Sequence, residues 1–189
     1  NDRSHEGDWF TKLGKICDIT SWLEYSSLKY LFLSPEKKNS NYHKVINWKE
    51  LKEKYSHNWT TENGYVLFDK DFEKELVNEG RNISQTWKTV FFVSWNKDKY
   101  LEEKIFIRQS AMSIIASLDE NHIFCLRSLF LCNLKKSESY YSLKSILWIL
   151  NSKYIEHYAL NNGIIRHGNW KQPQIRVEWL KNLPIPMYS

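Results

Sequence analysis

The sequence contains few of the residues that mark disulfide-rich, repetitive or membrane-spanning proteins. Its 189 residues include 3 cysteines, 6 glycines and 4 prolines. So few cysteines cannot build a disulfide framework and fit a reducing compartment, so we expect a cytoplasmic protein. The scarcity of glycine and proline excludes collagen-like and linker-like classes. No apolar stretch approaches the roughly 20 residues of a membrane span, and we expect no membrane partner.

The short motifs of common enzyme classes are lacking as well. The scattered glycines form no phosphate-binding loop, and no G-x-S-x-G is present. There is no H-x-x-x-H pair and no C-x-x-C, so we expect no structural metal and no catalytic residues. Metal-dependent nucleases use an acid followed by Glu-x-Lys, and Glu36 and Glu102 begin such triplets. Matches of this kind arise by chance in a highly charged chain, so a nuclease stays as a lesser alternative.

Aromatic side chains and positive charge are what the chain has in quantity. Trp, Tyr and Phe make up 15% of the residues, and the formal net charge is +5. An aromatic-rich chain of this length can bury a core, so a disordered tail is excluded. We expect most of the aromatics in that core, including Trp95, Trp148, Trp170 and Trp179. The charge permits a nucleic-acid partner without requiring one.

Strand and helix patterns alternate irregularly, without the rhythm of βαβ units, which predicts the α+β class. We expect irregular twisted antiparallel or mixed sheets, a few short helices and one long amphipathic helix near the C-terminus. Apolar residues at three- and four-residue spacing place that helix at 143–160, capped by Ser142 and stopped at 161–163. Within it, we assign Asn151 and Ser152 to packing or a local bend. Strands are predicted at 12–19, 64–68, 89–95, 104–108, 123–134 and 174–179, a short helix at 69–78, and an extended segment at 183–186.

Several segments of the second half follow one another in a specific order. They read KIFIRQ at 104–109, IIASLD at 114–119, SLKSILWILNSK at 142–153 and LPIP at 183–186. In this the chain resembles the TaqI-like C-terminal specificity domain of bacterial adenine-N6 DNA methyltransferases and type IIG restriction–modification enzymes. KLGKIC at 12–17 is similar to the first strand of such domains. The resemblance implies one target recognition domain over 1–189, with a lead-in at 1–11, a variable recognition part at 12–103 and a family-like core at 104–189.

The resemblance also implies a function shared with a separate catalytic domain. The chain would bind double-stranded DNA and select the methylated site, with no reaction and no cofactor of its own. In such enzymes an upstream domain binds S-adenosylmethionine and holds the flipped adenine through N-P-P-[YFW], which is absent here. Because the chain begins at Asn1 rather than Met, we expect a C-terminal fragment with a methyltransferase domain upstream. Half of a type I restriction specificity subunit is the alternative, although no long heptad-patterned helix follows.

Basic and amide side chains on predicted loops, and at one strand end, are the candidate DNA contacts. Lysine and arginine contact phosphates, whereas Arg, Asn and Gln can read base edges. For the strand end at 108–109, a structural hydrogen bond is an equal alternative. For the loop at 166–172, the alternative is a solvated loop around a buried tryptophan. The candidates are Arg81, Asn82, Gln85, Arg108, Gln109, Arg166, His167, Lys171 and Gln172.

Overall fold

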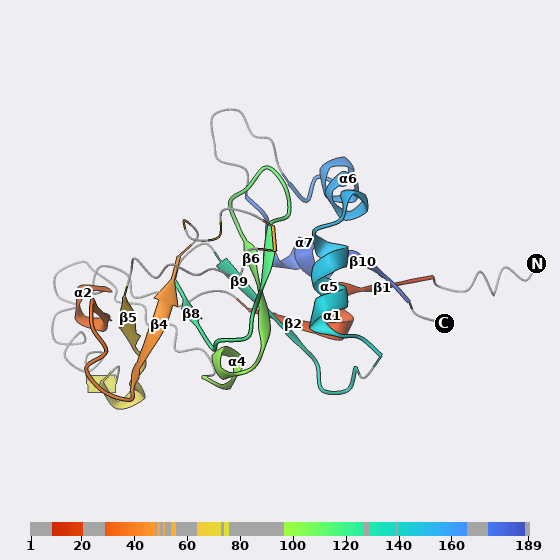
Figure 1. Cartoon of the computed structure of the whole chain (residues 1–189). Coiled ribbons are helices and arrows are strands. Elements are labelled where there is room, and N and C mark those ends of the chain that lie inside the picture. Colours follow the sequence, from red (N-terminus) through yellow and green to blue (C-terminus); the bar gives the residue numbers. More distant parts are fainter. Residues whose placement is uncertain are drawn as a thin grey trace, which may run out of the picture.

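The computed structural model of the chain contains short helices and strands in mixed order (Figure 1). It describes residues 9–20, 29–47, 49, 51, 54–55, 64–72, 74–75, 97–126, 129–138, 140–165 and 174–187. The helices are α1 (Leu13–Ile16), α2 (Lys29–Phe32), α4 (Asp98–Leu101), α5 (Leu143–Leu150), α6 (Lys153–Asn161) and α7 (Val177–Lys181). The strands are β1 (Phe10–Lys12), β2 (Cys17–Thr20), β3 (Leu33–Ser34), β4 (Tyr42–Ile46), β5 (Tyr65–Leu67), β6 (Lys104–Arg108), β7 (Ala116–Asp119), β8 (Phe124–Cys125), β9 (Leu129–Leu134) and β10 (Pro184–Pro186). This mixture confirms the α+β class.

A four-stranded antiparallel sheet, in the order β2-β9-β6-β7, lies at the centre of the molecule. Successive side chains of a strand point to opposite faces of its sheet. On β6, Ile105 and Ile107 join one hydrophobic cluster and Phe106 joins another, and β9 divides its side chains in the same way. The single strand predicted at 123–134 is wrong, because β8 pairs with β4 in another sheet and only β9 belongs to this one, but burial on both faces is confirmed for β9. It explains why the apolar run shows no alternation with polar residues.

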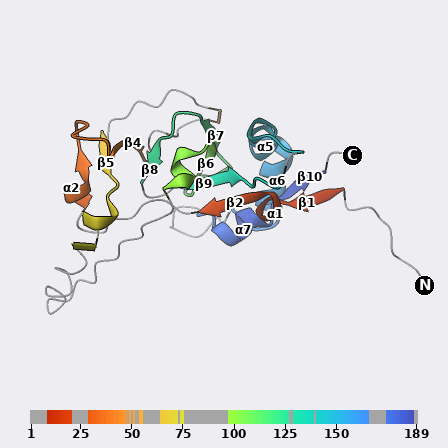
Figure 2. The same cartoon turned by 90° about the horizontal axis from the view of Figure 1, so that it is seen from below.

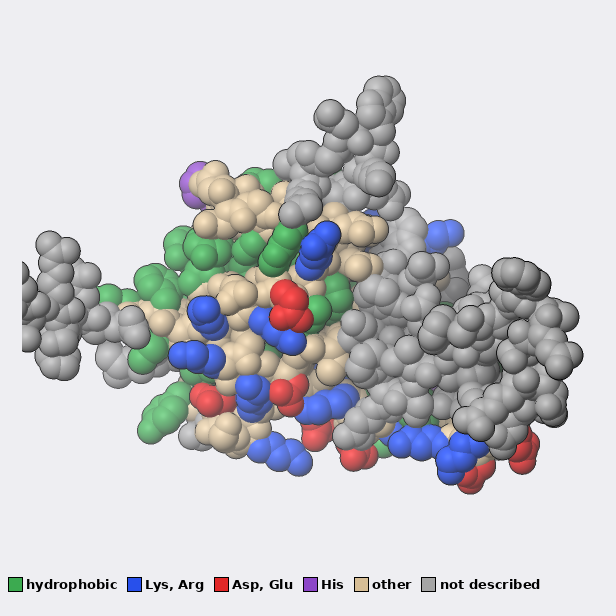
Figure 3. Space-filling view, turned by 180° about the vertical axis from the view of Figure 1, so that it is seen from behind, with side chains coloured by type: hydrophobic (Ala, Val, Ile, Leu, Met, Phe, Trp, Pro, Cys, Tyr) green, Lys and Arg blue, Asp and Glu red, His purple; other side chains and the backbone are tan. Residues whose placement is uncertain are grey.

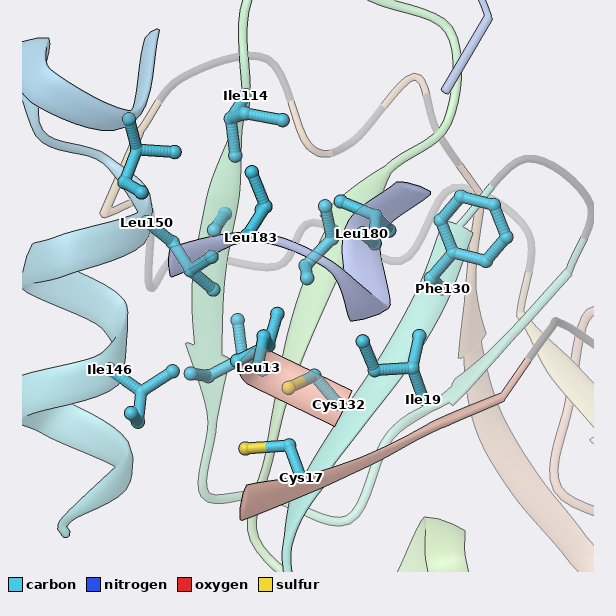
Figure 4. Packing of buried hydrophobic residues seen from close by; sticks show 14 of the residues in the cluster. Leu13, Cys17, Ile19, Ile114, Phe130, Cys132, Ile146, Leu150, Leu180 and Leu183 are labelled. Carbon is cyan, nitrogen blue, oxygen red and sulfur yellow. The ribbon is translucent and has the colours of Figure 1, made fainter. Parts of the chain in front are cut away.

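Helices and the terminal strands cover one face of the central sheet (Figures 1 and 2). Figure 4 shows Ile146 and Leu150 of α5 directed toward the sheet, where Cys132 lies, with Leu13 of α1 packed between them. The one-turn helix α1 buries both of its apolar residues, and α7 lies against it. Strand β1 pairs antiparallel with β10, so the extended segment predicted at 183–186 is confirmed as a strand. These elements enclose the first hydrophobic cluster.

A second sheet, in the order β3-β5-β4-β8, lies on the other side of the central sheet (Figure 2). Its strands pair antiparallel except for β4 and β8, which are parallel. Phe32, Phe68 and Phe124 meet Phe106 of the central sheet in the second hydrophobic cluster, which also buries Tyr100 completely. The central sheet is thus shared between two cores.

The predicted continuous helix over 143–160 is wrong, because the structure has two helices, α5 and α6, separated at Asn151 and Ser152. The Asn151 amide is buried and bonds to the backbone of Ala116 on β7: its Nδ2 donates to the carbonyl at 2.9 Å, and its Oδ1 accepts from the N–H at 3.1 Å. The Ser152 hydroxyl accepts from the N–H of Ile155 at 3.2 Å and caps α6. Polar side chains that bond to backbone compete with helix continuation. The assignment of both residues to packing or a bend is confirmed.

Two predicted strands also have a different structure. The segment 12–19 is interrupted by α1, because Leu13 and Ile16 are three residues apart and both reach the core from one helical turn. The segment 174–179 leads into α7, which buries Leu180. In both places, packing in the core stabilises a helical turn where a short alternating pattern had predicted a strand. The predicted strand 89–95 lies outside the described residues.

The expectation that the tryptophans lie in the core is wrong for Trp148. Its side chain is 67% exposed on the outer face of α5, where its ring lies 5.0 Å from that of Tyr55. Trp179 packs partly buried against the first cluster. Trp95 and Trp170 lie outside the described residues. The helical spacing that buries Ile146 and Leu150 turns the intervening position 148 toward solvent.

Candidate nucleic-acid interface

Of the candidate DNA contacts, Arg108 and Gln109 lie in the described part of the chain, where β6 ends. The Arg108 backbone N–H donates to the carbonyl of Ile115 at 3.0 Å. Its guanidinium Nη1 donates to the carbonyl of Leu51 at 3.4 Å. Burial lowers the pKa of the Arg108 side chain, although a guanidinium keeps its charge at neutral pH. This bond ties the segment at residue 51 to the central sheet, as the structural alternative for Arg108 expects, and a DNA contact of Arg108 stays a prediction.

Gln109 brings the segment before α7 to the same end of the sheet. Its carbonyl accepts from the N–H of Ile175 at 2.9 Å. The next residue is Arg176, whose guanidinium lies 5.2 Å from the ring centroid of Trp179. Sequence reasoning did not select Arg176, because the alternating segment around it was interpreted as a strand. A cation stacked on an aromatic ring keeps its hydrogen-bond donors free to point outward.

The residues on both sides of the candidate loop at 166–172 are hydrogen-bonded to described elements. On one side, the N–H groups of Ile164 and Ile165 donate to the carbonyl of Ala159 in α6, at 2.9 and 3.3 Å. On the other side, Ile175 is held by Gln109. The loop after β6 and helix α6 lie at the same end of the molecule (Figure 1). Arg166, His167, Lys171 and Gln172 themselves lie outside the described residues, as do Arg81, Asn82 and Gln85, so these contacts stay predictions.

Charges of both signs are interspersed on the side of the molecule shown in Figure 3. Three ion pairs lie on the elements around α1, α4 and α7. They are Lys99 with Asp18 at 2.7 Å, Lys136 with Glu102 at 3.6 Å and Lys181 with Glu178 at 3.5 Å. Lysines neutralised in this way attract a polyanion weakly, because DNA affinity depends on the phosphates that unpaired cations neutralise.

Several lysines around β4 have no carboxylate partner among the described residues, as is also true of Lys12, Lys15, Lys49, Lys70 and Lys135. Lys37, Lys38, Lys44 and Lys97 form no ion pair with any residue that the structure describes. Lys38 lies 5.9 Å from the ring centroid of Tyr42, and its positive charge is not cancelled by that contact. Sequence reasoning did not select these residues, because a lysine-rich loop is common on protein surfaces.

The nuclease interpretation of the Glu-x-Lys triplets has little geometric support. Lys104, the lysine of the second triplet, is completely buried and pairs with Asp119 at 2.5 Å. Its Nζ also donates to the carbonyl of Tyr100 at 2.6 Å, so it cannot assist an attacking water. Among the described residues, no three His, Cys, Asp or Glu side chains gather as metal ligands. Within the same residues, no helix has the length and apolarity needed to cross a bilayer.

The family model of the TaqI-like C-terminal specificity domain matches residues 35–185. The chain belongs to this family. The match includes β4, β5 and β8 of the second sheet and β6, β7 and β9 of the central one, and so extends well beyond the C-terminal segments that carry the sequence resemblance. Membership of the TaqI-like specificity family supports DNA sequence recognition in restriction–modification systems. The family is defined as a specificity domain and not as a catalytic one.

Comparison with other proteins adds little to the TaqI-like family match. No curated protein matches the chain. The structure described as "Crystal structure of Type-I restriction-modification system S subunit from M. genitalium" aligns over 98% of this chain with 13% identity and a TM-score of 0.47. This chain covers 36% of that structure, about a third of its length. A likeness this distant carries no argument about fold or function.

Proposed function

We propose that this TaqI-like specificity domain binds double-stranded DNA and selects the site that an adenine-specific methyltransferase or a type IIG enzyme methylates. The family match over 35–185 is the observation that supports this function. In this proposal, the catalytic domain lies outside the sequence and supplies the bound S-adenosylmethionine and the pocket for the flipped adenine. The domain itself needs neither a cofactor nor a metal.

The proposed base-reading surface is the end of β6. The Gln109 carbonyl is hydrogen-bonded to Ile175, the residue before Arg176, and the candidate residues 166–172 lie in the sequence between α6 and Ile175. Arginine and glutamine are suited to bidentate contacts with guanine and adenine in the major groove. The hydrogen bonds at Arg108 and Gln109 attach the flanking segments to the rigid central sheet, which would hold the reading side chains in register.

A domain exchange tests the proposed function directly. The chain would replace the specificity domain of a related methyltransferase, and methylated sites would be mapped by sequencing the host DNA. We expect the exchanged enzyme to methylate a new sequence. If it still methylates the sequence of the unmodified enzyme, the proposal is refuted. Gln172→Ala and Arg176→Ala in the exchanged domain should relax the new sequence at single positions, because one bidentate pair supplies about 1–3 kcal/mol of discrimination. Lys153→Ala, at a 94% exposed side chain on α6, is the control.

A further inference from the structure

The strands β1 and β10 form a two-stranded ribbon whose large apolar side chains are exposed. Trp9 is 75% exposed, and its carbonyl accepts from the N–H of Met187 at 2.9 Å. Phe10 stacks on Tyr154 of α6, with ring centroids 6.0 Å apart, and Phe10, Tyr154 and Met187 are each about half exposed. We call these four residues the terminal patch. Figure 3 shows hydrophobic side chains gathered at this edge of the molecule, at the left of the view.

The outer edge of β1 carries backbone donors that no described residue uses. The N–H of Leu13 donates to the carbonyl of Leu183 at 2.9 Å, so the odd-numbered residues at 9–13 turn their backbone groups toward β10. Because successive residues of an antiparallel pair alternate, the N–H groups of Phe10 and Lys12 point outward. Neither has a hydrogen-bond partner in the part of the chain that the structure describes. A further strand can therefore pair with β1.

The outer edge of β10 is closed, in contrast, by two prolines. Pro184 and Pro186 lie opposite Lys12 and Phe10, at the positions that turn outward, and proline has no N–H. The hydroxyl of Tyr141 also donates to the carbonyl of Pro186 at 3.3 Å. Proline on an edge strand hinders the pairing of a further strand. A strand that extends this ribbon would therefore join β1, beside the ring of Phe10.

The chemistry and size of the terminal patch suit a protein domain joined to this chain. Residues 9–11 and 184–187 carry no charged side chain, whereas cations are what hold a polyanion such as DNA. The patch exposes roughly 500 Å² of large side chains. A stable dimer of separate chains buries about 800 Å² on each partner. Domains of one polypeptide dock through smaller surfaces, because their covalent link raises the effective concentration.

We propose that the terminal patch and the open edge of β1 dock the catalytic domain that the proposed function requires. An extended segment of that domain would accept hydrogen bonds from the N–H groups of Phe10 and Lys12, and its apolar side chains would cover the patch. This inference rests on the proposed function. A domain joined to residue 1 would be at most about 28 Å of chain from Trp9. The ribbon lies on the side of the central sheet away from the second sheet (Figures 1 and 2), so docking there would leave the second sheet uncovered.

Hydrogen–deuterium exchange tests the docking at β1. The 189-residue chain would be compared with the longer polypeptide that includes the catalytic domain. We expect the amides of Phe10 and Lys12 to exchange at least tenfold more slowly in the longer polypeptide, because docking gives both donors an acceptor. Lys12→Pro removes one outward donor where φ is −89°, near the range of proline, and should reduce the protection of Phe10. Lys12→Gln loses the same charge but keeps the N–H, and should retain that protection.

A second variant tests the aromatic contact without introducing a proline. Phe10→Ser with Tyr154→Ser should leave the melting temperature of the 189-residue chain nearly unchanged, because both side chains are half exposed, yet abolish the protection of β1 in the longer polypeptide. Leu101→Ser, at an exposed apolar side chain on α4, is the matched control and should keep the protection.

The outcomes separate the docking from the proposed function. If the longer polypeptide methylates DNA but its β1 amides exchange as fast as in the 189-residue chain, the docking alone is wrong. If the 189-residue chain sediments as a dimer that Phe10→Ser with Tyr154→Ser dissociates, a second copy covers the patch and the docking is again wrong. If the longer polypeptide transfers no methyl group to DNA, the proposed function and the docking are both overturned.

Discussion

Asn151 joins the break between α5 and α6 to the edge of the central sheet. Among the described strands, β7 is the last of that sheet, so the outward backbone groups of Ala116 have no neighbour from another described strand. The Asn151 amide bonds to both groups, at 3.1 Å and 2.9 Å, and only 6% of the residue is exposed. Asn151→Ala removes the donor and the acceptor together and leaves the Ala116 N–H without this partner.

The expected loss of stability follows from these bonds. Two neutral hydrogen bonds contribute about 1 kcal/mol each, and a buried N–H left unpaired costs about 1 kcal/mol or more. The Ala116 carbonyl keeps a second donor, the N–H of Tyr55 at 3.1 Å, so the penalty for an unpaired group arises once. Asn151→Ala should therefore lower the free energy of unfolding by about 3 kcal/mol. In a domain of this size, that corresponds to a fall in melting temperature of about 6–12 °C.

Calorimetry or thermal circular dichroism measures this change. Asn161→Ala is the control, because Asn161 is exposed at the end of α6 and, among the described residues, its Nδ2 contacts only the exposed His157, at 2.7 Å. We expect less than about 0.5 kcal/mol there. Asn151→Asp keeps the shape and an acceptor but turns an oxygen toward the Ala116 carbonyl, so it should be at least as destabilising at pH 7. A loss at Asn151→Ala no larger than at Asn161→Ala would refute the bridging role.

Three further predictions concern the two cores. Gly64→Ala should cost more than about 2 kcal/mol in urea unfolding, because Gly64 has a φ of +68° and an added Cβ would overlap the Ser34 carbonyl. Lys104→Met should cost about 3–5 kcal/mol by the same measurement, because it leaves the Asp119 carboxylate buried without its ion-pair partner. Burial lowers the pKa of His43 in the folded chain to about 4 from an ordinary value of about 6.5, so the unfolded chain binds more protons in between. Stability should thus rise from pH 4 to pH 6.5 by about 1–2 kcal/mol after allowance for solvent screening, and a His43→Gln variant measured across that range should lack this rise.

The sequence predicted elements whose signals are local. Ser142 caps α5 with both hydrogen bonds of a capping box, and Gly163 has a positive φ of 65° just past α6, as the Asn-Asn-Gly stop indicates. Strand β6 occupies the predicted range, and β9 lies within its own. Each of these depends on side chains within a few residues of one another. The helical interpretation of 69–78 is confirmed for the described residues 70–72 and 74–75.

The candidate site was predictable only in part. Arg108 and Gln109 were selected because they end a strand, and the structure places them at a sheet end where several segments meet. The sequence did not indicate that the Arg108 guanidinium bonds to Leu51, because that segment is distant along the chain. Arg176 was missed because six alternating residues do not distinguish a strand from the start of a helix.

The sequence by itself determined the α+β class, the apolar strands that both cores share, the Ser142 cap, the stop at Gly163 and membership of the TaqI-like family. These follow from short-range periodicity and from motifs that are contiguous in the chain. The tertiary structure decided where the C-terminal helix breaks, because Asn151 bends the chain to reach Ala116, 35 residues earlier. It also decided which lysines keep an uncompensated charge. His43 of the second sheet and Tyr100 of α4 stack on the same ring of Phe124, and no local pattern encodes that contact.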